Sequence, residues 1–198
     1  MLPFMSEIAP LPRSPQLMSA GDTALLVVDV QGKLITLVPE HQRIIWNIRR
    51  LIDGAKVLGV PVLASEQYPQ GLGPTVPELA ERLGEISEKL SFSCGGCPQL
   101  FDDLPDRDIC RILVVGIETH ICIQQTVFDL MAADYHVYLA VDGVGSRHEI
   151  DRSTALSRMD SGGVTLTTTE AVLFEWCEVA GTSRFKQISA LVRETPPK

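Results

Sequence analysis

The chain has 198 residues, of which 45% are hydrophobic and 21% charged, a composition typical of a globular protein rather than a disordered or fibrous one. Its formal charge of −8 leaves no basic surface for nucleic acid or anionic lipid, so we expect a small molecule as its partner. The length fits one large domain with a substantial core.

Residues 1–21 are interpreted as an irregular N-terminal arm. They contain four prolines and lack the charged start and unbroken apolar core of a signal peptide. The apolar runs elsewhere are too short to cross a bilayer, so no membrane association is expected. Five cysteines at irregular spacing do not resemble a secreted disulfide framework. We therefore expect a cytoplasmic protein with mostly reduced thiols and a single domain over residues 22–198.

Strand-like apolar runs alternate with helical periodicity along this domain. The runs cover residues 24–30, 60–65, 112–116, 136–142 and 163–168. Apolar residues at three- and four-residue steps predict helices over 44–58, 123–131 and 150–159. Strands that are apolar on both faces and alternate with helices form parallel sheets covered on both sides. The sequence therefore predicts an α/β fold with a mainly parallel sheet between helical layers.

The segment from residue 66 to residue 108 interrupts this alternation. Its glycines and prolines predict loops, with a short helix near 76–83. Cys94 and Cys97 have the CxxC spacing of a redox or half-zinc motif, but the chain contains no second pair to complete a zinc site. We interpret the motif as a flexible loop with two thiols, and redox sensing remains an alternative.

Polar residues stand at the ends of several predicted strands. In an open parallel sheet, ligands bind beyond the carboxyl ends of the strands. Asp29 is near the end of the first strand, Glu66 and Gln67 follow the second, and Asp142 ends the run 136–142. A carboxylate such as Asp29 after four apolar residues must be paired, hydrogen-bonded or open to water. It is therefore either a cap for the following loop or a general base.

Cys122 is either a small apolar filler or a nucleophile. It stands where a helix begins, and free backbone N–H groups and the helix dipole there favour a thiolate, lower its pKa and offer an oxyanion site. Lys89 alone would be a surface lysine, whereas beside a thiolate and a carboxylate it would stabilise both. His120 is two residues from Cys122 and points to another helix face, so it is a poor catalytic partner.

Three separated segments resemble the isochorismatase-like cysteine hydrolases, which include nicotinamidases, carbamoylsarcosine amidases and isochorismatases. These segments are VVDVQ around Asp29, EKLSFS around Lys89 and GIETHICIQQT around Cys122. The segments EQYPQGLGPTVPEL, DRSTALSRMDSGG and FKQISALV are most similar to the subgroup of isochorismatase domain-containing proteins. The resemblance runs from about residue 22 to residue 190. It implies a three-layer α-β-α sandwich with a mainly parallel, six-stranded Rossmann-like sheet.

The resemblance also implies a catalytic triad at Asp29, Lys89 and Cys122. In these roles Cys122 attacks a carbonyl carbon, Asp29 takes the thiol proton and later activates water, and Lys89 stabilises the charges. A cis peptide between Ile117 and Glu118 would direct the N–H groups of Glu118 and Cys122 toward one oxyanion. The residues expected to line or border the pocket are Gln31, Leu34, Tyr68, Ile117 and Glu118. A homo-oligomer, dimer or tetramer, is expected, with the helix at 185–192 as a candidate interface.

Two departures from the family patterns narrow the expected chemistry. Metal-binding nicotinamidases carry histidines after the second strand, whereas this chain has no histidine between His41 and His120. True isochorismatases lack the nucleophilic cysteine. A lone glycine in GIETH also offers no dinucleotide fingerprint. We therefore expect no metal and no cofactor, and a hydrolase that cleaves a small amide, carbamoyl or related acyl substrate through a thioester. The alternative is a non-catalytic binding or scaffold protein that retains the fold.

Overall fold

A six-stranded sheet forms the middle layer of the protein. The structure, a computed structural model, describes residues 11–197. Every strand pair is parallel, and the spatial order is β3-β2-β1-β4-β5-β6. The strands are β1 (Thr23–Val28), β2 (Val62–Gln67), β3 (Ser87–Lys89), β4 (Arg111–Ile117), β5 (His136–Gly145) and β6 (Thr165–Thr167). The prediction of a three-layer α/β fold is confirmed.

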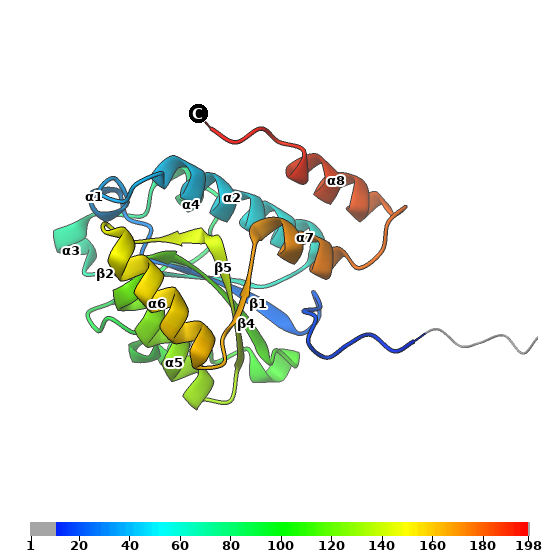
Figure 1. The fold of residues 1–198 in the computed structure, drawn as a ribbon, viewed down its shortest axis with the longest axis horizontal. Coiled ribbons are helices and arrows are strands. Elements are labelled where there is room, and N and C mark those ends of the chain that lie inside the picture. Colours follow the sequence, from blue (N-terminus) through cyan, green and yellow to red (C-terminus); the bar gives the residue numbers. More distant parts are fainter. Residues whose placement is uncertain (1–10, 198) are drawn as a thin grey trace, which may run out of the picture.

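Helices cover both faces of the sheet (Figure 1). One layer contains α2 (His41–Leu58), α7 (Thr169–Cys177) and α8 (Ser183–Val192), and the other contains α5 (Gln124–Ala132) and α6 (Glu149–Ser161). Loops beyond the strands hold the short helices α1 (Gly32–Ile35), α3 (Pro69–Leu72) and α4 (Pro77–Ala80). Among residues 11–197, no helix has the length and the apolar character that crossing a bilayer requires.

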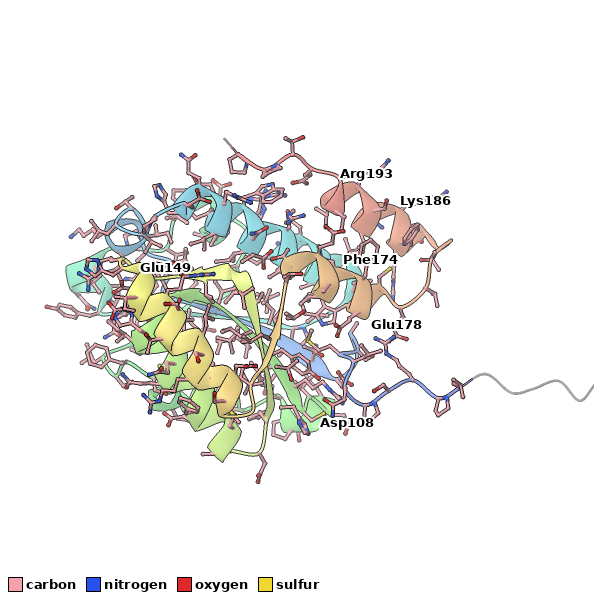
Figure 2. All side chains as sticks on the ribbon, viewed as in Figure 1. Asp108, Glu149, Phe174, Glu178, Lys186 and Arg193 are labelled. Carbon is pink, nitrogen blue, oxygen red and sulfur yellow. The ribbon has the colours of Figure 1, made fainter. Side chains whose placement is uncertain are left out.

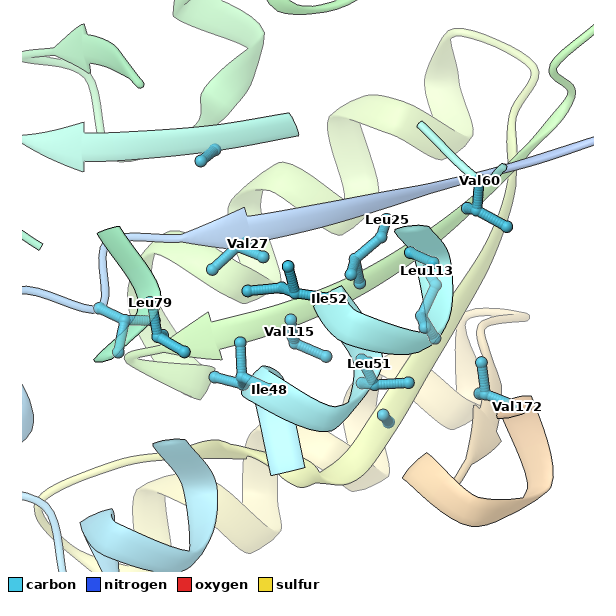
Figure 3. Close-up of a cluster of buried hydrophobic side chains, with 14 of the residues drawn as sticks. Leu25, Val27, Ile48, Leu51, Ile52, Val60, Leu79, Leu113, Val115 and Val172 are labelled. Carbon is cyan, nitrogen blue, oxygen red and sulfur yellow. The ribbon is translucent and has the colours of Figure 1, made fainter. Parts of the chain in front are cut away.

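The strands are apolar on both faces because each face packs against its own helical layer. On β1, Leu25 and Val27 join a cluster with Ile48, Leu51 and other residues of α2 (Figure 3). The alternate residues Ala24, Leu26 and Val28 join the cluster beneath α5 and α6. The burial of both side-chain sets explains why the strands appeared as unbroken apolar runs.

Three sequence-based expectations differ from the structure. The strand β3 was missed because it has only three residues, lies at the sheet edge and pairs with β2 alone. Asp142 does not end its strand, because β5 continues to Gly145. Cys94 and Cys97 are not in an exposed flexible loop, because both thiols are buried in the cluster beneath α5 and α6.

The N-terminal arm is irregular over the part that the structure describes, and residues 1–10 lie outside it. Residues 11–21 contain no helix or strand, yet they pack along the domain. Met18 is buried, and its backbone N–H donates to the carboxylate of Glu175 at 2.9 Å. Arg111 donates to the carbonyl of Pro15 at 2.6 Å. Part of the arm is therefore attached to the domain.

The carboxyl ends of the strands face one end of the molecule. Figure 2 places Glu149, which begins α6 after β5, at the end opposite Asp108, which precedes β4. The chain proceeds from β1 outward to β2 and β3, then returns to add β4 on the other side of β1. Such a reversal of strand order opens a crevice between the neighbouring strand ends, where ligands bind in open α/β sheets.

Gly116 brings β4 close to β1 at this edge. Its φ is +123°, and an added Cβ would lie 2.0 Å from the carbonyl oxygen of Val28. We predict that Gly116→Ala lowers the free energy of unfolding by about 1–3 kcal/mol or more, because the methyl group overlaps backbone that cannot rotate away. Urea unfolding measures the change.

Gly84→Ala is the matched control, because an added Cβ there meets no atom within 4 Å. A small or stabilising change is expected at that position. Equal stability of the two variants would show that the close approach at Gly116 is not required.

Candidate active site

Asp29 directly follows β1, at the carboxyl edge of the sheet. Its backbone has a positive φ of 54°, a conformation that aspartate tolerates better than most residues. The backbone N–H of Asp29 donates to Ser65 O at 3.1 Å, and its carbonyl accepts from Gln31 N at 2.7 Å. The residue is fully buried. Its carboxylate is therefore held by the turn that ends β1, and partners within the protein must compensate its charge.

Lys89 supplies the opposite charge from the end of β3. Its Nζ donates to Asp29 Oδ2 at 2.7 Å and to Gln67 Oε1 at 2.7 Å. The carbonyls of Phe92 and Ser91 accept from the same nitrogen at 2.9 and 3.3 Å. An ammonium group has three hydrogens, and these four acceptors account for all of them. Lys89 is therefore fixed in place as a buried cation beside Asp29.

Ser65, on β2, contacts the second carboxylate oxygen of Asp29. Its hydroxyl donates to Asp29 Oδ1 at 2.8 Å. Each oxygen of Asp29 thus accepts one hydrogen bond from the sheet and keeps acceptor capacity for a further donor. A buried ion pair is tolerated when its remaining hydrogen-bonding groups are satisfied in this way.

Cys122 lies in a π-helical turn, η4 (Thr119–Ile123), that joins β4 to α5. Only 7% of the residue is exposed. Burial raises the pKa of its thiol, the nearby Asp29 carboxylate raises it further, and Lys89 lowers it. The prediction that the helix start lowers the pKa is therefore wrong, because desolvation and a neighbouring anion outweigh the helix dipole.

Asp29 and Lys89 are thus in direct contact at the carboxyl edge of the sheet, and the charges of both affect the pKa of the Cys122 thiol. The arrangement therefore consists of a thiol whose pKa is raised and a hydrogen-bonded ion pair between Asp29 and Lys89. A separate hollow of about 350 Å³ lies beside the end of β5, and its lining does not include these three residues. Within residues 11–197, His, Cys, Asp and Glu side chains form no group of three or more suited to a metal ion.

The turn before Cys122 is attached to the loop after β5. The peptide between Ile117 and Glu118 is cis, as the resemblance implied. The Glu118 carboxylate accepts from both the backbone N–H and the side-chain Nε of Arg147, each at 3.0 Å. His120 pairs with the hydroxyl of Ser146 at 3.0 Å. These contacts fix the turn that carries Cys122.

The other residues considered for the site occupy different surroundings. The Gln31 side chain is buried and binds backbone: Nε2 donates to Gln67 O and Gly73 O at 3.0 and 2.6 Å, and Oε1 accepts from Gln67 N at 2.8 Å. Leu34 is partly buried, Ile117 is fully buried and Tyr68 is exposed. Glu66 binds the backbone and hydroxyl of Thr75, so it fastens a loop rather than joining the three residues.

Asp142 is also occupied elsewhere. One of its carboxylate oxygens accepts from the backbone and hydroxyl of Thr169 at 2.9 and 3.0 Å, at the start of α7. The sequence did not indicate that Ser65 contacts Asp29, or that Cys94 contacts Ser65. A serine inside a buried strand was the one available signal for Ser65, and the CxxC spacing drew attention away from the single thiol of Cys94.

Comparison with known proteins identifies the family. The model of the isochorismatase domain matches residues 23–171. Isochorismatase domain-containing protein 2 from Rattus norvegicus is 39% identical over 175 residues, which are 88% of this chain and 82% of the rat protein.

Solved structures share the fold. The MAR1 ribonuclease from Caenorhabditis elegans aligns with a TM-score of 0.85 and 36% identity, over 92% of this chain and 95% of that one. The YcaC gene product from Escherichia coli, described as an octameric hydrolase of unknown specificity, aligns with a TM-score of 0.82 over 91% of this chain and 92% of that one. Its identity of 21% supports a shared fold alone. The resemblance found in the sequence is confirmed, and the chain belongs to the isochorismatase domain family.

Proposed function

We propose that this protein is a metal-independent cysteine hydrolase that cleaves a small amide, carbamoyl or related acyl compound through a thioester on Cys122. The observation that carries the proposal is the buried Asp29 carboxylate. It binds Lys89 at 2.7 Å, and its charge raises the pKa of the Cys122 thiol. A nucleophile paired with a base that other groups orient is the usual constellation for covalent catalysis.

The first half of the reaction forms the thioester. The sulfur of Cys122 attacks the carbonyl carbon of the substrate while the thiol proton moves to Asp29. The tetrahedral intermediate carries a negative oxygen, and the backbone N–H groups of Glu118 and Cys122 stabilise it. The intermediate then collapses, the carbon–nitrogen bond breaks, and the leaving amine takes the proton from Asp29. The acyl group remains on the sulfur of Cys122.

The second half releases the acid. Asp29, ionised again, takes a proton from a water molecule as that water attacks the thioester carbonyl. The carbon–sulfur bond breaks, and the sulfur recovers its proton from Asp29. Lys89 keeps its proton throughout, because its hydrogens point at protein acceptors rather than at the substrate. Its role is to compensate the charge of Asp29 in the buried site.

The surroundings of the site favour a small substrate. Cys122 is only 7% exposed, which leaves room for no more than a small compound at its sulfur. We assign Gln31, Leu34, Tyr68, Ile117 and Glu118 to the border of the substrate pocket, as the family resemblance implies, and of these Tyr68 is exposed and Leu34 partly buried. The structure contains five free cysteines, which fits a reducing location such as the cytoplasm.

One relative bears the name of a ribonuclease, so RNA cleavage is the second candidate. The net charge of −8 opposes it, because RNA-binding surfaces are usually basic. A panel of small amides, ureides and carbamoyl compounds, with a short RNA included, distinguishes the two activities. Turnover of RNA alone by wild type would contradict the proposed substrate class.

We also propose that the protein is a homo-oligomer. Tyr68, Leu90 and Phe92 lie at the ends of β2 and β3, and they are 50%, 75% and 54% exposed. Three large apolar side chains in one region of a surface mark an interaction site. This edge is a better interface than α8, where Ile188 is buried and Phe185 partly buried against the same chain.

Cys122→Ala is expected to reduce kcat/KM by at least about 10³-fold on any substrate found in the panel, because it removes the nucleophile. The melting temperature should fall by only a few degrees, because little buried volume is lost. Cys110→Ala is the matched control, since that thiol is exposed. Normal turnover by the Cys122 variant would contradict the mechanism.

The pH dependence of Cys122 alkylation tests Asp29 without a known substrate. In the resting form, the one proton shared by the pair is on the sulfur of Cys122 and Asp29 is ionised. In the reactive form the same proton is on Asp29 and Cys122 is a thiolate. The two forms carry the same number of protons, so the ratio between them does not depend on pH. The rate of iodoacetamide labelling should therefore be constant over roughly pH 6–8. In Asp29→Asn the rate should instead rise about tenfold per pH unit, as for an ordinary thiol.

Peptide mass spectrometry locates the label at Cys122 in this experiment. Identical slopes for wild type and Asp29→Asn would show that Asp29 does not accept the thiol proton.

Light scattering after size exclusion tests the interface. The double variant Leu90→Glu, Phe92→Glu should shift the protein to a smaller species, because the added charges cannot be buried between subunits. Val179→Glu is the control, at a residue that is 61% exposed on another part of the surface. A monomeric wild type, or an unchanged mass in the double variant, would contradict the proposed interface.

A further inference from the structure

A second thiol is connected to the site by hydrogen bonds. Cys94 Sγ donates to Ser65 Oγ at 3.4 Å, and Ser65 Oγ donates to Asp29 Oδ1 at 2.8 Å. Cys94 lies in the 3-10 turn η1 (Cys94–Gly96), and Ser65 lies on β2. Both residues are buried. A chain of two donors therefore runs from the CxxC segment to the proposed base.

We propose that Ser65 and Cys94 are positioning residues that orient the Asp29 carboxylate toward Cys122. This inference rests on the proposed function, because it assigns a role to Asp29 as the base. Both residues would act on the reaction only through the position of the Asp29 carboxylate. The sequence offered Cys94 and Cys97 as a pair, whereas the structure connects only Cys94 to the site.

The direction of the two hydrogen bonds follows from the chemistry of the three groups. A serine hydroxyl has one hydrogen and two lone pairs. The carboxylate is the strongest acceptor nearby, so it receives the serine hydrogen, and the thiol donates to a serine lone pair. Burial raises the pKa of Cys94 to about 11, so this thiol keeps its proton at neutral pH. The rotation of the Ser65 hydroxyl is thereby restricted.

The position of Cys94 is itself fixed by the helix that follows the nucleophile. The backbone N–H of Cys94 donates to the hydroxyl of Thr126, on α5, at 2.9 Å. Ser93 caps the turn by accepting from Gly95 N at 3.0 Å. The segment that carries Cys94 and the helix that follows Cys122 are therefore connected directly. These contacts hold Asp29 and Cys122 in fixed positions relative to each other.

Cys97 provides a natural comparison. It is also buried and only three residues away, but its Sγ donates to the backbone carbonyl of Glu88 at 3.4 Å. It has no hydrogen bond to Ser65 or to Asp29. Replacing either cysteine removes a similar volume, so a difference between the two variants reports on the hydrogen bond rather than on packing.

The rate of Cys122 alkylation is expected to be constant over a range of pH, and we call this range the plateau. Its position on the pH scale is a readout that a purely structural role would not change. The titratable groups around Asp29 are Lys89, Cys122, Cys94 and Cys97. Burial raises the pKa of the Cys94 and Cys97 thiols, and Lys89 is held by four acceptors, so the acidic edge of the plateau reports on the Asp29 carboxylate. Loss of the Ser65 hydrogen bond makes the carboxylate easier to protonate. The edge should therefore move to higher pH.

The test compares alkylation profiles and kinetics across a graded series. In Ser65→Ala the acidic edge should move up by roughly one pH unit, and kcat should fall about 10-fold or more with little change in KM. Ser65→Cys keeps a weaker donor of similar size and should fall between Ser65→Ala and wild type. Cys94→Ala should move the edge in the same direction by less. Cys94→Ser keeps a donor and should behave like wild type.

Cys97→Ala should leave both the edge and kcat unchanged. Melting temperatures confirm that each variant is folded, and Ser65→Cys keeps the experiment informative if Ser65→Ala unfolds. If wild type has a plateau and the Ser65 variants do not move its edge, the positioning role is wrong while the base stands. Equal effects of Cys94→Ala and Cys97→Ala would also overturn the role of Cys94. If wild type has no plateau, the base and its positioning residues are both wrong.

Discussion

The buried ion pair between Asp29 and Lys89 is the interaction on which the site depends. Removing two charges from water costs several kcal/mol for each ion, so such a pair persists only with good geometry and full hydrogen bonding. Here Lys89 has four oxygen acceptors, and Asp29 has donors on both oxygens. These partners come from three neighbouring strands or the turns that follow them. The sheet therefore provides a fixed electrostatic environment into which the thiol of Cys122 is placed.

The same electrostatic balance favours a protonated Cys122 thiol over a free thiolate. A cation next to Cys122 would stabilise the thiolate, but Lys89 is already paired with Asp29. Burial and the adjacent carboxylate dominate and raise the pKa of the Cys122 thiol. The Asp29 carboxylate would repel a thiolate beside it. This repulsion disappears if the carboxylate takes the thiol proton, so Asp29 is a suitable acceptor for that proton. Activation is therefore expected during the attack and not before it.

The sequence predicted the parts of the fold that depend on periodic burial. Runs such as 24–30 and 112–116 are apolar on both faces, so the parallel sheet between helices could be recognised. The edge strand β3 could not, because three residues with one neighbouring strand leave little pattern. The same limit affected Lys89, which seemed to be a surface residue from its polar neighbours. Only the family resemblance placed it beside Asp29.

Side-chain networks within the site were harder to predict. Ser65 belongs to an ordinary strand pattern, and Cys94 belongs to a CxxC spacing with a better-known meaning. Their connection depends on how the turn after β3 folds against β2 and α5, which no local pattern encodes. The pKa direction at Cys122 was predicted wrongly for a similar reason. A helix start is visible in a sequence, whereas burial and a carboxylate from another strand are not.

Rapid-quench mass spectrometry during turnover of an accepted amide tests the central claim most directly. A transient adduct with the mass of the acyl group is expected on the peptide that contains Cys122, formed and lost at rates consistent with kcat. Hydrolysis that proceeds with no adduct at any time, or with an adduct on a different residue, would contradict it.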